Sequence, residues 1–245
     1  MRFPGDHGDR VAAASAMNQL GPMPAIIGEL GWTGRLLGGL YPQGVRLTTR
    51  DFLWLAALSG SPGAIGWDGT TTAPGEFRMF AKILGDARFA GLRKRRSPRA
   101  VAVGDPRAEC DNVTRFEHAF SRLGVDYDVI EANAHAPGQT WLASEFVEPE
   151  ADAIIACSSG YRAKVWVGQD GSVLAYVRND GGTDGYGNRV CRPAECKLDL
   201  HLPTRATVKV FDLDGQTVVA ERGRGKVHKI RLGETTHDFV VWARP

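Results

Sequence analysis

The sequence has little of what would place it in a specialised class of protein. Its 245 residues include only four cysteines, too few for a fold built on disulfides, and their spacing is not that of a zinc site. The longest apolar run, Phe52 to Leu58, is far shorter than the roughly 18 residues of a membrane helix. The first residues also lack the apolar stretch of a secretory signal. We therefore expect a chain that neither spans a membrane nor carries its own export signal, and its compartment stays open.

Strong charge and recognisable ligand motifs are also missing. With 30 Lys and Arg against 28 Asp and Glu, the net charge of +2 does not favour a nucleic-acid partner. The one dense basic run, Arg93–Arg96, is interpreted as a solvated linker rather than an anion site. The six histidines contain no His-x-x-x-His pair, and no Gly-x-Gly-x-x-Gly motif follows the turn at Gly104-Asp105-Pro106. We therefore expect neither a metal nor a nucleotide cofactor.

What is present is an ordinary globular composition, 43% apolar and 24% charged, with three regions of different periodicity. To about residue 92, short apolar runs alternate with helical patterns, which is typical of repeated strand-helix units. Ala25–Gly28 has the pattern of a strand buried on both faces. A helix capped by Thr48 or Thr49 is expected to continue to Leu58, and Ala64–Asp68 predicts the next strand.

The middle region, 97–158, predicts a short flavodoxin-like α/β layer. Strands at Ala100–Asp105 and Tyr127–Ile130 enclose a helix that Gly124 would end, and a right-handed crossover makes such strands parallel. Ala153–Ala156 is expected to add a third strand. From 160 to 245 the period changes to two, and seven short strands with hairpin turns predict an antiparallel β-sandwich. Cys191 and Cys196, in that region, are either a small disulfide loop or two free thiols.

Glu29 is the residue most suggestive of chemistry. It directly follows the buried run Ala25–Gly28, and side chains at the carboxyl ends of barrel strands face the active site. A carboxylate there can act as nucleophile or base, although a glutamate after a strand can equally be an ordinary surface residue. Position alone leaves both interpretations open.

A resemblance favours the catalytic interpretation. The segment Pro24–Trp32, which reads Pro-Ala-Ile-Ile-Gly-Glu-Leu-Gly-Trp, resembles the seventh barrel strand of the retaining clan-A glycoside hydrolases, where such a segment carries the nucleophilic glutamate. Arg50–Gly60 followed by Ala64–Trp67 is similar to the helix and eighth strand of that barrel. The resemblance implies that Glu29 is the nucleophile.

The same resemblance implies a substrate site around Glu29. In the family, a tryptophan at the end of the eighth strand forms a platform under the sugar, and this role falls on Trp67. Trp32 and Asp68, which lie close to the two strand ends in the sequence, are expected to bind substrate as well. Three other tryptophans, Trp54, Trp166 and Trp242, lie in apolar patterns and are expected in the core instead.

The layout of the whole chain resembles that of the beta-galactosidase-like enzymes of this clan. They follow the barrel with a flavodoxin-like domain and a small β-sandwich, the order that periodicity predicts here. The implied domains are a partial (β/α) barrel at 1–92, comprising its last two βα units, the flavodoxin-like layer at 97–158 and the sandwich at 160–245. The implied partner is a carbohydrate substrate, with no cofactor, metal, nucleic acid or membrane, and a homo-oligomer stays open.

One departure from the family concerns the second catalytic group. The retaining mechanism needs a carboxylic acid about 5 Å from the nucleophile, which the family supplies from the fourth strand. Nothing before Glu29 can be that strand, and a complete barrel takes about 250 residues by itself. We therefore expect a C-terminal fragment, inactive alone, or a degenerate relative. The alternatives are a non-catalytic carbohydrate-binding or interaction module and a small-molecule-binding α/β protein.

Overall fold

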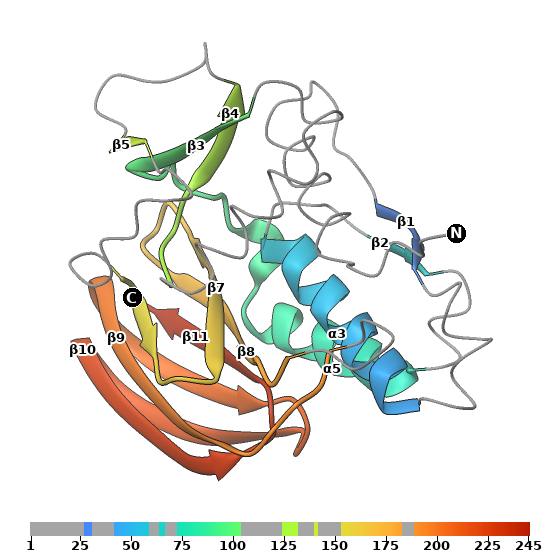
Figure 1. The fold of residues 1–245 in the computed structure, drawn as a ribbon. Coiled ribbons are helices and arrows are strands. Elements are labelled where there is room, and N and C mark those ends of the chain that lie inside the picture. Colours follow the sequence, from blue (N-terminus) through green and yellow to red (C-terminus); the bar gives the residue numbers. More distant parts are fainter. Residues whose placement is uncertain are drawn as a thin grey trace.

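The computed structural model consists mainly of antiparallel β-sheet, with few helices (Figure 1). It describes residues 27–30, 42–58, 64–66, 73–103, 124–131, 140–141, 153–182 and 189–245. No helix in these ranges has the length and apolar character needed to cross a membrane.

A curved sheet of six strands dominates the C-terminal part. Its main path is β10–β9–β11–β8–β7, all antiparallel, and β6 pairs with the first part of β9. In chain order the strands are β6 (Ile155–Cys157), β7 (Tyr161–Val167), β8 (Val173–Asn179), β9 (Ala194–Asp212), β10 (Thr217–Thr235) and β11 (Phe239–Arg244). Figure 1 shows the long strands β9 and β10 curving together, which gives the sheet a barrel-like form.

Alternation of apolar and polar residues produces these strands. In β9, Leu198 and Leu200 are buried whereas the positions between and beside them are more exposed, as expected where alternate side chains point to opposite faces. The β7–β8 turn is closed by a hydrogen bond from the Gly168 amide to the Ser172 carbonyl at 2.8 Å. Gly171 has a φ of 83° in this turn, which glycine adopts without strain. The hairpin turn that Gln169-Asp170-Gly171 predicts is confirmed.

The predicted sandwich of seven short strands is replaced by fewer and longer strands in one sheet. Residues 197–202 and 206–211 belong to the single strand β9, and 217–219 and 227–232 belong to β10. Between His201 and Ala206, β9 has more residues than the facing part of β10, and the register shifts on both sides of Gly225. These bulges bend the two strands without ending them. The antiparallel character of the region is confirmed, whereas its division into separate short strands is wrong.

The inner face of the sheet encloses an apolar core to which every strand contributes. Its fully buried members include Ile155, Val167, Val173, Leu200 and Val241. Because the sheet bends around this core, its strands need no second sheet to bury that face.

Two helices cover the outer face of the sheet, α3 (Pro42–Leu58) and α5 (Pro74–Asp86), and a short 3-10 helix, η1 (Phe89–Gly91), follows them. Trp54 of α3 contacts the ring of Phe80 at 5.0 Å and that of Tyr176 at 6.3 Å between centroids. Pro74, which the sequence predicts as the start of a helix, begins α5, and the three expected core tryptophans are buried. The predicted cap of α3 at Thr48 or Thr49 is wrong, because the helix already begins at Pro42.

Two small parallel sheets precede the large one. β1 (Ile27–Leu30) pairs with β2 (Ala64–Gly66), and α3 lies between them in the chain. This is one strand-helix-strand unit, and the described residues do not show a TIM barrel. The helix that the sequence pattern predicts at Val11–Leu20 lies outside the described residues.

The second parallel sheet has the order β4–β3–β5, from β3 (Arg99–Val103), β4 (Asp128–Glu131) and β5 (Thr140–Trp141). The predicted parallel pairing of the first two is therefore confirmed, while the predicted helix between them lies outside the described residues. The predicted third strand is wrong, because Ile155–Cys157 pairs with β9 of the large sheet. Gly124, with a φ of 57°, accepts hydrogen bonds from Ile154 and Ile155, and a side chain at that glycine would collide with Ile155.

Candidate functional site

Glu29, the predicted nucleophile, is the third of the four residues of β1. The strand pairs in parallel with β2, so the carboxyl ends of both strands lie at the same edge. The structure describes the backbone of Glu29 and not its side chain. Trp32, Trp67 and Asp68 lie outside the described residues. The structure thus brings the two strands together and describes none of the four predicted side chains.

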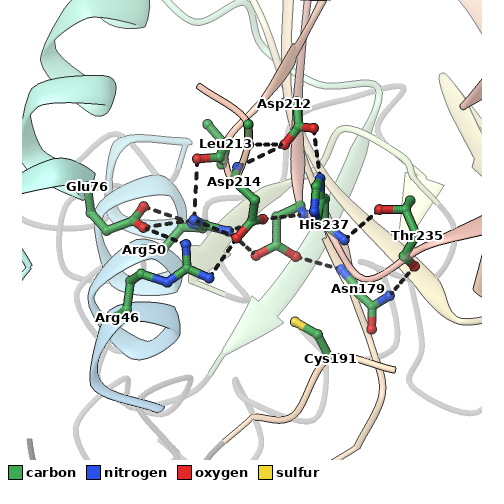
Figure 2. A network of polar contacts seen from close by, with 12 residues as sticks. Arg46, Arg50, Glu76, Asn179, Cys191, Asp212, Leu213, Asp214, Thr235 and His237 are labelled. Carbon is green, nitrogen blue, oxygen red and sulfur yellow. Dashed lines mark hydrogen bonds and ion pairs between the residues drawn. The ribbon is translucent and has the colours of Figure 1, made fainter. Parts of the chain in front are cut away.

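A cluster of buried charges joins the helix that follows β1 to the large sheet (Figure 2). Arg50 of α3 has no exposed surface. Its Nε and Nη2 donate hydrogen bonds to the two carboxylate oxygens of Glu76 on α5, at 2.8 and 2.7 Å. Its Nη1 donates to Asp214 at 2.7 Å and to Asp238 at 3.0 Å. One guanidinium therefore binds three carboxylates, two of which come from segments that flank the strands of the sheet.

Arg189 binds the same central carboxylate. Its Nη1 and Nη2 donate to the two oxygens of Asp238 at 2.9 and 2.7 Å, the two-pronged geometry of a strong arginine–carboxylate pair. Its Nε donates to Asp51, the neighbour of Arg50 on α3, at 2.8 Å. The hydroxyl of Tyr176 on β8 donates to Asp51 at 2.6 Å. Helix α3 is thus attached to the sheet through two adjacent residues of opposite charge.

These contacts determine which groups are charged. Burial alone would raise the pKa of Asp238, but the Arg189 and Arg50 guanidiniums hold it well below its usual range. The pKa of Asp214 is also lowered, because hydrogen bonds and charge from Arg50 outweigh burial. Burial raises the pKa of Tyr176 well above its usual value. The cluster therefore contains ionised carboxylates and a neutral phenol, and these acids do not have the pKa of a general acid near neutral pH.

Asp212, Asp214 and His237 are close enough to be considered as a metal site, since one ligand atom of each lies within 4.8 Å of the others. Their atoms already have partners. Asp212 accepts a hydrogen bond from His237 Nδ1 at 2.8 Å and two more from backbone amides of the β9–β10 turn. Asp214 is paired with Arg46 at 2.6 Å and with Arg50. The ion pairs with Arg46 and Arg50 place positive charge beside Asp214, and these residues are best described as part of the charge cluster.

Sequence reasoning missed this cluster although one signal was visible. Arg50 and Asp51 are charged residues that directly precede the apolar run Phe52–Leu58, and both are buried together with that helix. Asp238, which binds Arg50, is 188 residues away in sequence, and Arg189, which binds Asp51, is 138 residues away. A single sequence offers no means to pair residues so far apart. The one local signal was two adjacent charged residues next to the apolar run of the same helix.

The basic run Arg93–Arg96 is bound to the protein rather than forming a solvated linker. Lys94 Nζ lies 2.7 Å from Asp128 and 3.1 Å from Asp126, a residue with no exposed surface. The backbone of Arg95 donates to the carbonyl of Val167 on β7 at 2.9 Å. The linker prediction is therefore wrong, because buried acids beside β4 neutralise part of the run.

Cys191 and Cys196 are free thiols, which settles the alternatives that the sequence left open. Cys196 lies in the inner core, whereas Cys191 Sγ is 3.4 Å from Nη1 of Arg189 at the margin of the charge cluster. Burial raises the pKa of Cys191 to about 11 and that of Cys196 to about 12. Both are protonated at neutral pH, so neither is an activated nucleophile.

Comparisons with known proteins find only distant similarity. No model of a protein family and no curated protein matches the chain. Among solved structures, α-L-fucosidase isoenzyme 2 from Paenibacillus thiaminolyticus aligns with 10% identity and a TM-score of 0.27, over 38% of this chain and 15% of that one. A GH27 β-L-arabinopyranosidase from Geobacillus stearothermophilus aligns with 9% identity and a TM-score of 0.23, over 82% of this chain and 54% of that one.

These distant structural neighbours are glycoside hydrolases, and the chain spans 15% of the length of the first and 54% of the length of the second. TM-scores this low assign neither a fold nor an activity. A functional assignment must therefore stand on the chain's own residues.

Proposed function

We propose that this chain is the C-terminal part of a retaining glycoside hydrolase and that Glu29 is its nucleophile. The observation that carries the proposal is the parallel pairing of β1 with β2, with α3 between them in the chain. The resemblance to clan-A enzymes requires such a unit, with the nucleophile on the first strand and the sugar platform after the second. Because parallel strands end at the same edge, Glu29 and Trp67 would meet there.

The proposed chemistry has two displacements. The Glu29 carboxylate attacks the anomeric carbon, and the bond to the leaving oxygen breaks as a carboxylic acid from outside this chain protonates that oxygen. Water then attacks the glycosyl–enzyme ester, giving its proton to the same outside group and releasing Glu29 as a carboxylate. Trp67 would stack on the sugar ring and exclude water from its face.

The buried charge cluster supports this proposal as a means of holding the strand-helix unit. Asp51 and Arg50 attach α3 to the sheet and to α5, and α3 lies between the two strands that would form the site. A nucleophile must be held in position to within a fraction of an ångström, which a loosely attached unit could not do.

The test uses the full-length protein as its own gene produces it, isolated through a tag at its C-terminus. Wild type, Glu29→Ala and the matched control Glu131→Ala, which alters the final glutamate of parallel strand β4, are assayed on aryl glycosides of several sugars. We expect loss of several orders of magnitude in rate for Glu29→Ala only. Azide should restore part of the activity by taking the vacated place, and its product should be a glycosyl azide of inverted configuration.

The 245-residue chain by itself should show no turnover above that of a Glu29→Gln control, since it lacks the acid that the first displacement needs. If Glu29→Ala keeps most of the activity of the full protein, Glu29 is an ordinary strand residue and the proposal is wrong.

A second candidate function, a carbohydrate-binding module, is favoured by one pocket. It has a volume of about 390 Å³ and lies between α5 and strands β9–β11. Phe211 and Trp242 line it together with the polar side chains of Lys82, Asp86 and Gln216. Aromatic and polar groups in one concave site suit a sugar ring. Neutral sugars that shift amide resonances of these residues in the absence of any Glu29-dependent hydrolysis would favour the module.

A further inference from the structure

Strand β10 carries a concentration of positive charge that the proposed active site does not use. Between Glu221 and Glu234 it contains five exposed cations and no acid. We call these residues the basic stripe: Arg222, Arg224, Lys226, Lys229 and Arg231. Their five charges exceed the net charge of +2 of the whole chain, so the rest of the chain is net acidic.

Most of the stripe has no carboxylate partner in the described part of the chain. Lys229 lies 3.8 Å from Asp199, at the margin of an ion pair. Arg222 and Arg224 donate only to backbone carbonyls, those of Glu221 at 2.9 Å and Arg205 at 3.4 Å. The stripe therefore differs from Arg50 and Arg189, whose charges are neutralised within the protein, and its charge is available to an external anion.

The stripe also lies on the edge of the large sheet. Among the described strands β10 pairs only with β9 and lies at the edge of the sheet (Figure 1), so the amides and carbonyls on its outer side have no strand partner in the described part of the chain. Charges on an edge strand ordinarily prevent pairing with another strand. Here the same charges stand beside a row of free hydrogen-bond donors and acceptors, which together form an elongated polar surface.

We propose that the basic stripe and the edge of β10 bind an anionic polysaccharide along the strand. Guanidinium groups match the geometry of carboxylate or sulfate, and alternate residues of a strand are about 6.8 Å apart, which suits a charged polymer. Sugar hydroxyls both donate and accept hydrogen bonds, as the edge of a strand does. A phosphodiester backbone offers acceptors only, and β10 contains no Phe, Tyr or Trp on which bases could stack, while its one imidazole, His228, is buried.

The choice of a carbohydrate rests on the proposed function, and the inference goes further by making the polymer anionic and placing its contact on β10. Binding is measured with Glu29→Gln in the full 245-residue chain, so that hydrolysis plays no part. A protein that binds the polymer but has no glycosidase activity would keep this inference and lose the proposed function. A glycosidase that does not bind it would do the reverse.

The probes are a soluble polyuronate, neutral dextran of similar length, duplex DNA and vesicles containing anionic lipid, compared by calorimetry at two salt concentrations. The test variant combines Arg222→Gln, Arg224→Gln and Lys226→Gln. The matched control removes three charges elsewhere, through Arg78→Gln, Arg93→Gln and Arg192→Gln. All six side chains are exposed, and thermal unfolding of both variants verifies that the fold is kept.

We expect the polyuronate to bind and dextran not to bind. The test variant should lose about tenfold in affinity and much of the salt dependence, whereas the control should change by less than twofold. Absence of polyuronate binding, or an equal loss in both variants, would overturn the proposal. Binding of DNA or vesicles as tight as that of the polyuronate would also overturn it, because the stripe would then serve a nucleic acid or a membrane.

Discussion

The two faces of the large sheet are held by different kinds of contact. The inner face packs apolar side chains such as Leu200 and Val241 against one another, while the outer face combines aromatic rings with the buried charges of Arg50, Asp238 and Arg189. Apolar packing does not depend on one particular partner, because any apolar side chain of suitable size removes apolar surface from water. A buried charge needs each partner, because one left alone keeps its full desolvation cost.

The two kinds of contact differ in whether they need the helices α3 and α5 to be docked on the sheet. The inner core is made by residues of the sheet itself. The complete charge cluster forms only when α3 and α5 are docked on the sheet. Its loss should therefore weaken the attachment of the strand-helix unit that contains Glu29.

The largest expected effect is that of Asp238→Ala. This change leaves two buried guanidiniums without their common carboxylate and should reduce the free energy of unfolding by about 3–5 kcal/mol. Urea unfolding followed by tryptophan fluorescence measures it. Asp86→Ala, at an exposed aspartate of α5, is the matched control and should cost no more than about 0.5 kcal/mol. Equal effects of the two changes would show that the cluster does not hold the faces together.

The next effect is the dependence of stability on pH. The pKa of Asp238 and that of Asp214 are lower in the folded state than in the unfolded state. Their contribution is therefore complete above the unfolded pKa of about 4 and is lost as the pH falls through that value toward the folded pKa. Each unit of pKa displacement is worth about 1.4 kcal/mol. Urea unfolding at several values from about pH 6 to about pH 3 should show a steeper loss of unfolding free energy in wild type than in Asp238→Asn. Parallel curves would contradict this expectation.

The smallest effect is expected on the inner face. Ile155→Val removes one buried methylene from the core and should cost about 0.5–1.5 kcal/mol. The loss should be the same at all the pH values above, because no charge is involved. A pH-dependent loss would mean that the inner core and the charge cluster are not separate, and urea titrations of the same series decide it.

The parts predictable from sequence are those that local pattern determines. Alternation located most strands, Pro74 marked the start of α5, and apolar patterns identified Trp54 as a core residue. The strand that carries Glu29 and its successor pair in parallel, as expected from a strand-helix-strand order.

The parts that failed depend on contacts between distant residues. The bend at Gly225 and the facing residues of β9 look like strand ends in the sequence, because the turn-forming residues are the same in a bulge and in a loop. Lys94 appeared solvated because its acidic partners follow some 30 residues later. Two carboxylate partners of Arg50, Asp214 and Asp238, lie 164 and 188 residues away. For Lys94 and Arg50 the local pattern shows only a charged residue, and the fold supplies a partner that the pattern does not specify.

The most direct test of the central claim is covalent trapping of the nucleophile. The full protein is incubated with glycosyl fluorides that carry a second fluorine beside the anomeric carbon, which slows the second displacement so that the glycosyl–enzyme accumulates. We expect the intact mass to increase by one sugar residue and peptide fragmentation to place that sugar on Glu29, with no labelling of Glu29→Gln. Labelling of a different carboxylate, or of Glu29→Gln to the same extent, would contradict the assignment of Glu29 as the nucleophile.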